Sequence, residues 1–207
     1  VAEQTPTRAE CALPEDAFVF CCLNGLQKLD LATFESWMRI LSRVVVKGMD
    51  YLRVVEKAPH GYGRGMNPCI DCRIYMLRKV SGMMEELGAS FVITGEVLGQ
   101  RPMSQHRQAI ELIDKESGLA GRILRPLSAH HLPPTHPEVE GIVDRAKLLS
   151  ISGRSRKPQI ALAEQLGVRD YPCPAGGCLL TDPEIAARLR DLFAHVPGYT
   201  HRDLVVL

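Results

Sequence analysis

The stretch from residue 71 to residue 99 restricts the fold of this chain more than any other part. Asp71 can cap a helix, and apolar residues then recur at helical spacing on one face: Ile74, Leu77, Val80, Met84 and Leu87. Gly88 is suited to end that helix, and the apolar run 91–94 predicts a buried strand that closes at Gly95. Helix, glycine, short strand and glycine loop is the order found in α/β proteins, so we expect an α/β fold with a parallel sheet.

Weaker patterns predict the remaining elements. We expect strands at 18–22 and 123–124, a weak strand at 51–55, and helices at 30–41, 105–116, 144–149, 158–167 and from 182 onward. Residues 130–137 hold three histidines and three prolines, which predict a stiff, exposed connection without metal ligands.

Composition excludes several classes of protein. The chain has 207 residues, enough for one domain or parts of two, and a net charge of +1, which argues against binding driven by bulk charge. No apolar run approaches the ~18 residues of a membrane helix, and the N-terminus has no signal-peptide pattern, so we expect a cytoplasmic protein with no membrane partner. The chain does not start with Met, and we expect the true start to be missing.

Thiols give the strongest local signal. The seven cysteines are expected to be reduced. The Cys69-Ile70-Asp71-Cys72 pair, at a loop-to-helix junction, can hold a metal or cluster or work as a redox pair. Cys173 and Cys178 add thiols in a Pro/Gly loop. The alternative is that these cysteines are small buried hydrophobic residues, but the surrounding Gly/Pro loops favour function for Cys69, Cys72 and Cys178.

Two further patterns suggest anion binding. The loop 94–100 follows a strand and carries two glycines, as nucleotide-binding loops do, although it is neither G-x-G-x-x-G nor a Walker motif. Arg154, Arg156 and Lys157 form a basic turn that could hold a phosphate backbone, and solvated loop charges are an equally good interpretation.

From about residue 50 to 207 the chain resembles tRNA thiolation proteins related to tRNA 4-thiouridine synthase. The resemblance lies in five motifs: residues 60–72, 94–105, 125–128, 151–159 and 174–183. It implies a Rossmann-like parallel sheet of the adenine nucleotide alpha hydrolase type. It also implies tRNA thiouridine biosynthesis, in which ATP adenylates a tRNA uridine and sulfur then displaces AMP.

The same resemblance implies roles for individual residues. Gly95, Gln105 and Arg73 match nucleotide contacts. Cys178 matches a sulfur-handling cysteine. With Cys69 and Cys72 it fits the three ligands of a four-iron four-sulfur cluster. These three cysteines are therefore the predicted catalytic and metal-binding residues. The implied cofactors are ATP and Mg²⁺, and the implied partners are tRNA, through the basic turn, and a sulfur donor protein or sulfide.

The N-terminal part departs from that family. The S-G-G-x-D-S loop that cradles pyrophosphate is missing. Residues 11–43 resemble instead a fragment of bacterial O-linked N-acetylglucosamine transferase, in which Lys28 matches a lysine that contacts the UDP phosphate and Gly25 replaces the usual Gln. We therefore expect a glycosyltransferase-like fragment at 1–46, a thiolation domain at 47–195 that is incomplete on its N-terminal side, and the start of a truncated segment at 196–207.

Three functions remain open at this point. The first is ATP-dependent sulfur transfer to tRNA, which we expect to fail in this chain alone because the pyrophosphate loop is missing. The second is a non-catalytic iron–sulfur or metal-binding module, and the third is a fragment of a sugar-nucleotide transferase. Whether the chain is an enzyme is left undecided by its sequence.

Overall fold

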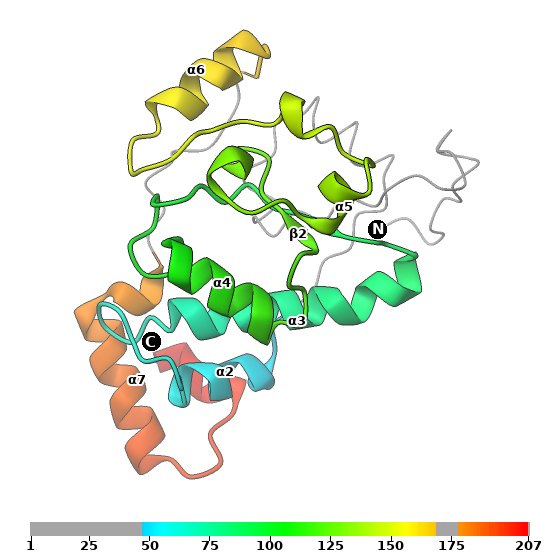
Figure 1. The fold of residues 1–207 in the computed structure, drawn as a ribbon. Coiled ribbons are helices and arrows are strands. Elements are labelled where there is room, and N and C mark those ends of the chain that lie inside the picture. The colour runs from blue at the N-terminus through cyan, green and yellow to red at the C-terminus, as the bar shows by residue number, and fades with distance from the viewer. Residues whose placement is uncertain (1–46, 169–177, 207) are drawn as a thin grey trace.

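The structure is a computed structural model that describes residues 47–168 and 178–206 (Figure 1). Its α-helices are α2 (Met49–Glu56), α3 (Cys69–Leu87), α4 (Arg107–Glu116), α5 (His136–Val139), α6 (Lys157–Gln165) and α7 (Pro183–His195). Its strands are β1 (Val92–Ile93) and β2 (Ile123–Leu124). Short 3-10 helices are η2 (Ala129–His131), η3 (Arg145–Lys147), η4 (Leu179–Thr181) and η5 (His201–Val206). No helix in this part of the chain is long and apolar enough to cross a membrane.

Helix α3 is the central element. Its inner face buries Ile74, Leu77, Val80 and Met84, as the sequence pattern predicts, and each such side chain contributes roughly 1.5–3 kcal/mol by leaving water. Gly88 ends the helix in the left-handed conformation, with φ +61°, and its N–H bonds the carbonyls of the last turn.

A parallel strand pair lies beside α3. Val92 pairs with Ile123 and Ile93 with Leu124, and α4 connects the two strands, which makes a βαβ unit. An isolated parallel bridge joins Leu98, in the segment after β1, to Ser152. Two short strands are too few to decide the sheet type, so the Rossmann-like adenine nucleotide alpha hydrolase fold stays a prediction.

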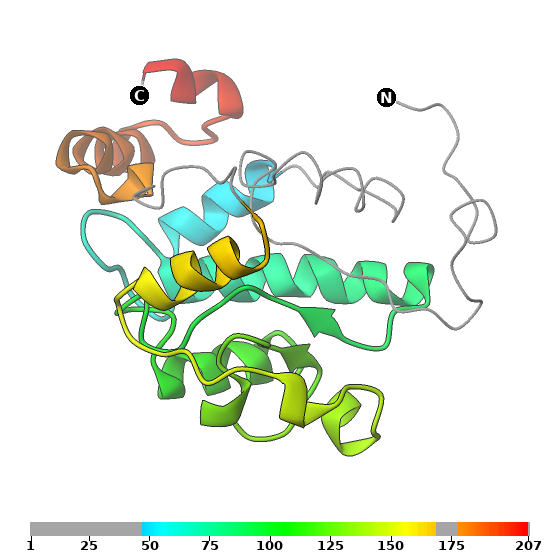
Figure 2. The same ribbon diagram turned by 90° about the horizontal axis from the view of Figure 1, so that it is seen from above.

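Two apolar cores lie on opposite sides of α3. The first joins α3 to the strands and α4, with Leu77, Val92, Ile113 and Ile123 among its members. The second joins α2 to α7 through Val55, Met66, Ala186 and Leu189. Figures 1 and 2 show the same arrangement: α3 runs through the middle, α4 and β2 lie on one side, and α2 and α7 on the other.

The structure corrects some of the predicted elements. The predicted weak strand at 51–55 is part of helix α2, because Tyr51 and Val55, one helical turn apart, both pack inward: Val55 is 1% exposed and the Tyr51 ring lies 5.4 Å from that of Tyr75. The predicted helix at 144–149 is only the 3-10 turn η3, capped by the Asp144 side chain.

The other predicted helices form, with small shifts of their ends. Helix α4 begins after His106, whose ring nitrogen accepts the Ala109 N–H, and α7 begins after Asp182, which caps its first turn. The elements predicted at 18–22 and 30–41 lie outside the described residues, and the domain boundaries at 46/47 and 195/196 stay predictions.

Candidate functional site

Three predicted cysteines gather around the start of α3. Cys69 is the first residue of the helix, Cys72 lies one turn further on, and Cys178 immediately precedes η4. All three are free thiols and partly exposed. We call Cys69, Cys72 and Cys178 the thiol cluster. The predicted Cys173 lies outside the described residues.

Backbone contacts bring the loop of Cys178 to α3. The N–H of Met66 donates to the carbonyl of Leu180 at 2.8 Å, and Arg190 donates to the carbonyl of Gly65 at 3.0 Å. Gly65 has φ +70°, and a Cβ placed on it would lie 2.4 Å from the Leu180 carbonyl oxygen. Only glycine therefore allows η4 to approach the loop that leads into Cys69.

Cys72 has two polar neighbours from α2 and its approach. The hydroxyl of Tyr51 donates to the Cys72 sulfur at 3.2 Å, and the Lys47 ammonium lies 3.6 Å from the same sulfur. Lys47 also lies 4.4 Å from the centre of the Tyr51 ring. A hydroxyl group and an ammonium group therefore both lie at the Cys72 sulfur.

The thiols act on one another electrostatically. Burial raises the pKa of Cys69, and the negative charges of Cys178 and Cys72 raise it further, against the lowering effects of Asn67 and Arg101. Burial also raises the pKa of Tyr51, and its hydrogen bond to Cys72 adds to the rise. Cys69 is therefore the thiol that ionises less readily than an ordinary cysteine.

The thiol cluster is not a formed metal site. Among residues 47–168 and 178–206, no three His, Cys, Asp or Glu side chains are placed to hold one metal ion. The predicted ligation of a metal or cluster by Cys69, Cys72 and Cys178 thus finds no support in the geometry of the described residues.

Arg73, one of the predicted nucleotide contacts, belongs to a buried ion network. Glu96, 4% exposed, accepts from Arg73 Nε at 2.8 Å and from Arg125 Nε at 2.9 Å. Arg125 also donates twice to Asp114, at 2.8 and 2.6 Å. Burial alone would raise the pKa of Glu96, but the positive charges of Arg73 and Arg125 overcome it and hold that pKa below its ordinary value. Arg73 is therefore already engaged by Glu96.

The loop that follows β1 is buried at its two ends and more open between them, where residues 98–103 are half-buried or exposed. Gly95 is exposed, but Glu96, Val97 and Gln105 are buried, and among the described residues the side-chain oxygen of Gln105 has no hydrogen-bond partner. The pocket expected along residues 96–105 stays a prediction. The nucleotide contacts proposed for Gly95, Gln105 and Arg73 stay predictions.

A pocket does occur on another side of the βαβ unit. It has a volume of about 200 Å³ and lies between α4 and the segment 120–138, with Ile110, Leu124 and Pro133 in its wall. Two of its acidic side chains are held by arginines: Asp114 by Arg125, and Glu138 by Arg145. None of the predicted site residues lines it.

The basic turn is open to solvent. Arg154 and Lys157 are exposed, Arg156 is half-buried, and no ion pair within the described part of the chain involves them. An RNA contact through these residues stays a prediction.

His60 forms a polar junction that the sequence analysis did not predict. Its Nδ1 lies 2.7 Å from Asp71 and its Nε2 3.1 Å from Glu116, so it joins the loop after α2 to α3 and α4. The hydrogen bond with Asp71 raises the pKa of His60, and Glu116 adds to the rise, against a lowering by burial. No local spacing in the sequence links His60 to Asp71 and Glu116. The same is true of the contacts that Lys47 and Tyr51 make with Cys72, so sequence patterns could not predict either set of contacts.

Comparison with known proteins found similarity in the N-terminal part of the chain. Residues 3–60 match the model of Glycosyl transferase family 41. A probable UDP-N-acetylglucosamine–peptide N-acetylglucosaminyltransferase of Arabidopsis thaliana is 42% identical over 48 residues, which are 23% of this chain and 5% of that protein. The corresponding transferase of Caenorhabditis elegans is 47% identical over 38 residues, 18% of this chain and 3% of that protein. No solved structure matches the chain.

These findings correct the predicted function. The matching family and relatives are glycosyltransferases, and nothing in them supports tRNA thiolation or an iron–sulfur protein, so the prediction of ATP-dependent sulfur transfer to tRNA is wrong. The predicted ATP, Mg²⁺, tRNA and sulfur donor belonged to that activity, and no observation tests them. The resemblance of residues 11–43 to O-linked N-acetylglucosamine transferase is confirmed, and it is residues 3–60 that are similar to Glycosyl transferase family 41.

Proposed function

We propose that residues 3–60 contribute to a binding site for UDP-N-acetylglucosamine, as part of a glycosyltransferase. The observation that carries this proposal is the match of these residues to Glycosyl transferase family 41. The names of the two relatives supply the donor, because both are UDP-N-acetylglucosamine–peptide transferases. The chain spans 5% or less of either relative, so transfer to a peptide is proposed for a larger assembly of which this segment is one part.

Lys28 is the residue on which the proposal can be tested. The resemblance to O-linked N-acetylglucosamine transferase implies that its ammonium contacts the UDP phosphate. A cation at a diphosphate forms charge-assisted hydrogen bonds and stabilises the negative charge that grows on UDP as the sugar leaves. Lys28 lies outside the described residues, and its role is taken from that resemblance.

The end of the matched segment is anchored in the described part of the chain. Val55 is buried against α7, and His60 bonds both α3 and α4. Residues 47–60, the described end of the matched segment, are therefore held to the rest of the fold by apolar and polar contacts.

The test is UDP binding to the full chain by isothermal titration calorimetry. We expect UDP to bind more tightly than ADP, and Lys28→Ala to weaken UDP binding at least about 10-fold, equivalent to about 1.4 kcal/mol. Lys115→Ala is the matched control, because Lys115 is an exposed lysine on α4 outside the matched segment, and it should bind UDP like the unmodified chain. Equal weakening by both substitutions, or equal affinity for UDP and ADP, would contradict the proposal.

A further inference from the structure

The sugar-nucleotide proposal leaves the thiol cluster without a role. Three free thiols from two segments lie around the start of α3, close enough that the charges of Cys178 and Cys72 act on Cys69. Thiols that serve only as packing groups are usually fully buried, whereas these three are partly exposed. Their placement suits chemistry with a molecule that arrives from solvent.

The three thiols differ in their surroundings. Among the described residues, Cys72 is the thiol with both a hydroxyl donor, Tyr51 at 3.2 Å, and an ammonium, Lys47 at 3.6 Å. These two contacts to its sulfur distinguish Cys72 from Cys69 as the attacking sulfur in thiol–disulfide exchange. Cys69 differs from Cys72, because burial raises its pKa.

The C-x2-C spacing suits a reversible disulfide. Residues three apart on a helix have Cβ atoms about 5–6 Å apart, and a disulfide needs about 3.5–4.5 Å. Cys69 is the first residue of α3, where the backbone N–H has no partner within the helix, so the first turn can shift by the remaining distance without breaking the helix.

We propose that Cys72 and Cys69 form a thiol–disulfide exchange couple that reacts with low-molecular-mass disulfides such as glutathione disulfide. The Cys72 thiolate attacks one sulfur of the glutathione disulfide, a new S–S bond forms, and one glutathione thiolate leaves. The Cys69 thiolate then attacks the Cys72 sulfur and displaces the second glutathione. The protein dithiol loses two electrons and two protons, and one glutathione disulfide becomes two glutathione molecules.

The experiment uses the reduced full chain with glutathione disulfide under argon, stopped by alkylation and mapped by peptide mass spectrometry. Mapping is needed because the chain has seven cysteines. We expect a disulfide between Cys69 and Cys72. With Cys69→Ser, the Cys72–glutathione mixed disulfide should accumulate. With Cys72→Ser, modification at Cys69 should be at least 10-fold slower.

Two matched variants test the assigned roles. Cys178→Ser should still form the Cys69–Cys72 disulfide, because Cys178 has no part in the exchange. Lys47→Met should slow the attack by Cys72 several-fold without changing which disulfide forms. An unchanged rate at Cys69 in Cys72→Ser, or a disulfide to Cys178 in the unmodified chain, would overturn the proposal. Circular dichroism of each variant establishes that it is folded, and mapping of the unmodified chain tests the pairing without any substitution.

Discussion

Replacing Arg125 by methionine should destabilise the fold strongly, because Arg125 holds two acidic groups inside the molecule. Its side chain is 2% exposed, and its partners Glu96 and Asp114 are 4% and 17% exposed. Methionine has a similar volume, so the loss is mainly electrostatic and leaves little cavity. Removing one member of a buried ion pair costs about 3–5 kcal/mol. Glu96 keeps Arg73, so we expect the lower end, about 3 kcal/mol.

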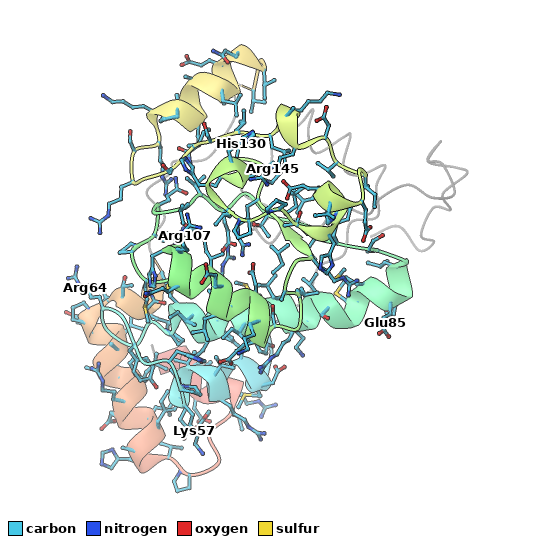
Figure 3. All side chains as sticks on the ribbon, viewed as in Figure 1. Lys57, Arg64, Glu85, Arg107, His130 and Arg145 are labelled. Atoms are coloured by element: carbon cyan, nitrogen blue, oxygen red, sulfur yellow. The ribbon has the colours of Figure 1, made fainter. Side chains whose placement is uncertain are left out.

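Urea unfolding followed by circular dichroism measures this loss, with a constant m-value as the check on two-state behaviour. Arg107→Met is the control, because Arg107 lies on the surface of α4 with one hydrogen bond to the carbonyl of His131 (Figure 3). We expect Arg107→Met to cost less than about 1 kcal/mol. Adding Asp114→Asn to Arg125→Met should recover part of the stability, since it removes the orphaned charge. If Arg125→Met lost no more than Arg107→Met, the network would not be the stabilising element inferred from its burial.

Two further predictions concern junctions around the thiol cluster. The bonds of His60 to Asp71 and Glu116 raise its pKa above the ordinary 6.5, so they stabilise the fold fully below pH 6.5 and lose that effect as the pH rises through the raised pKa. The urea-derived free energy of unfolding should therefore fall as the pH rises above 6.5, and a His60→Gln variant with an equally steep fall would contradict this. Gly65→Ala should destabilise the fold more than Gly118→Ala. Both glycines have positive φ, but of the two only Gly65 would place a Cβ against backbone, 2.4 Å from the Leu180 carbonyl oxygen. Thermal unfolding of the two variants compares them, and equal midpoints would refute the close approach.

Local patterns predicted the central elements well. The apolar spacing from Ile74 to Leu87 specified α3 and Gly88 its end, because both depend on neighbours within a few residues. Helix α2 was missed because Val54 and Val55 favour strands locally, whereas packing of Val55 against α7 decides the conformation. The pairing of Cys69 with Cys72 could be predicted for the same reason as α3, because both cysteines lie within one helical turn.

The partners of the candidate site could not be predicted in the same way. Tyr51 reaches Cys72, and Arg125 reaches Glu96, from elements that meet only when the chain folds. The predicted function was wrong for a different reason. Motifs spread over residues 60–183 suggested tRNA thiolation, while the comparisons matched residues 3–60 to Glycosyl transferase family 41. Shared motifs report shared local structure, but activity depends on the whole set of residues that contact the substrate.

The segment that resembles a glycosyltransferase and the thiol cluster are physically joined. The family match runs through residue 60, so it includes Lys47 and Tyr51, the two residues that contact Cys72. It also includes Val55, which packs against α7, and His60, which bonds α3. Tyr51 of α2 contacts Cys72 and packs, like Val55 one turn further on, against the second core. The last part of the matched segment therefore cannot leave the fold without exposing Val55 and removing the hydroxyl from Cys72. Residues 47–60 therefore belong structurally to the α3 and α7 body, although their sequence groups them with the N-terminal segment.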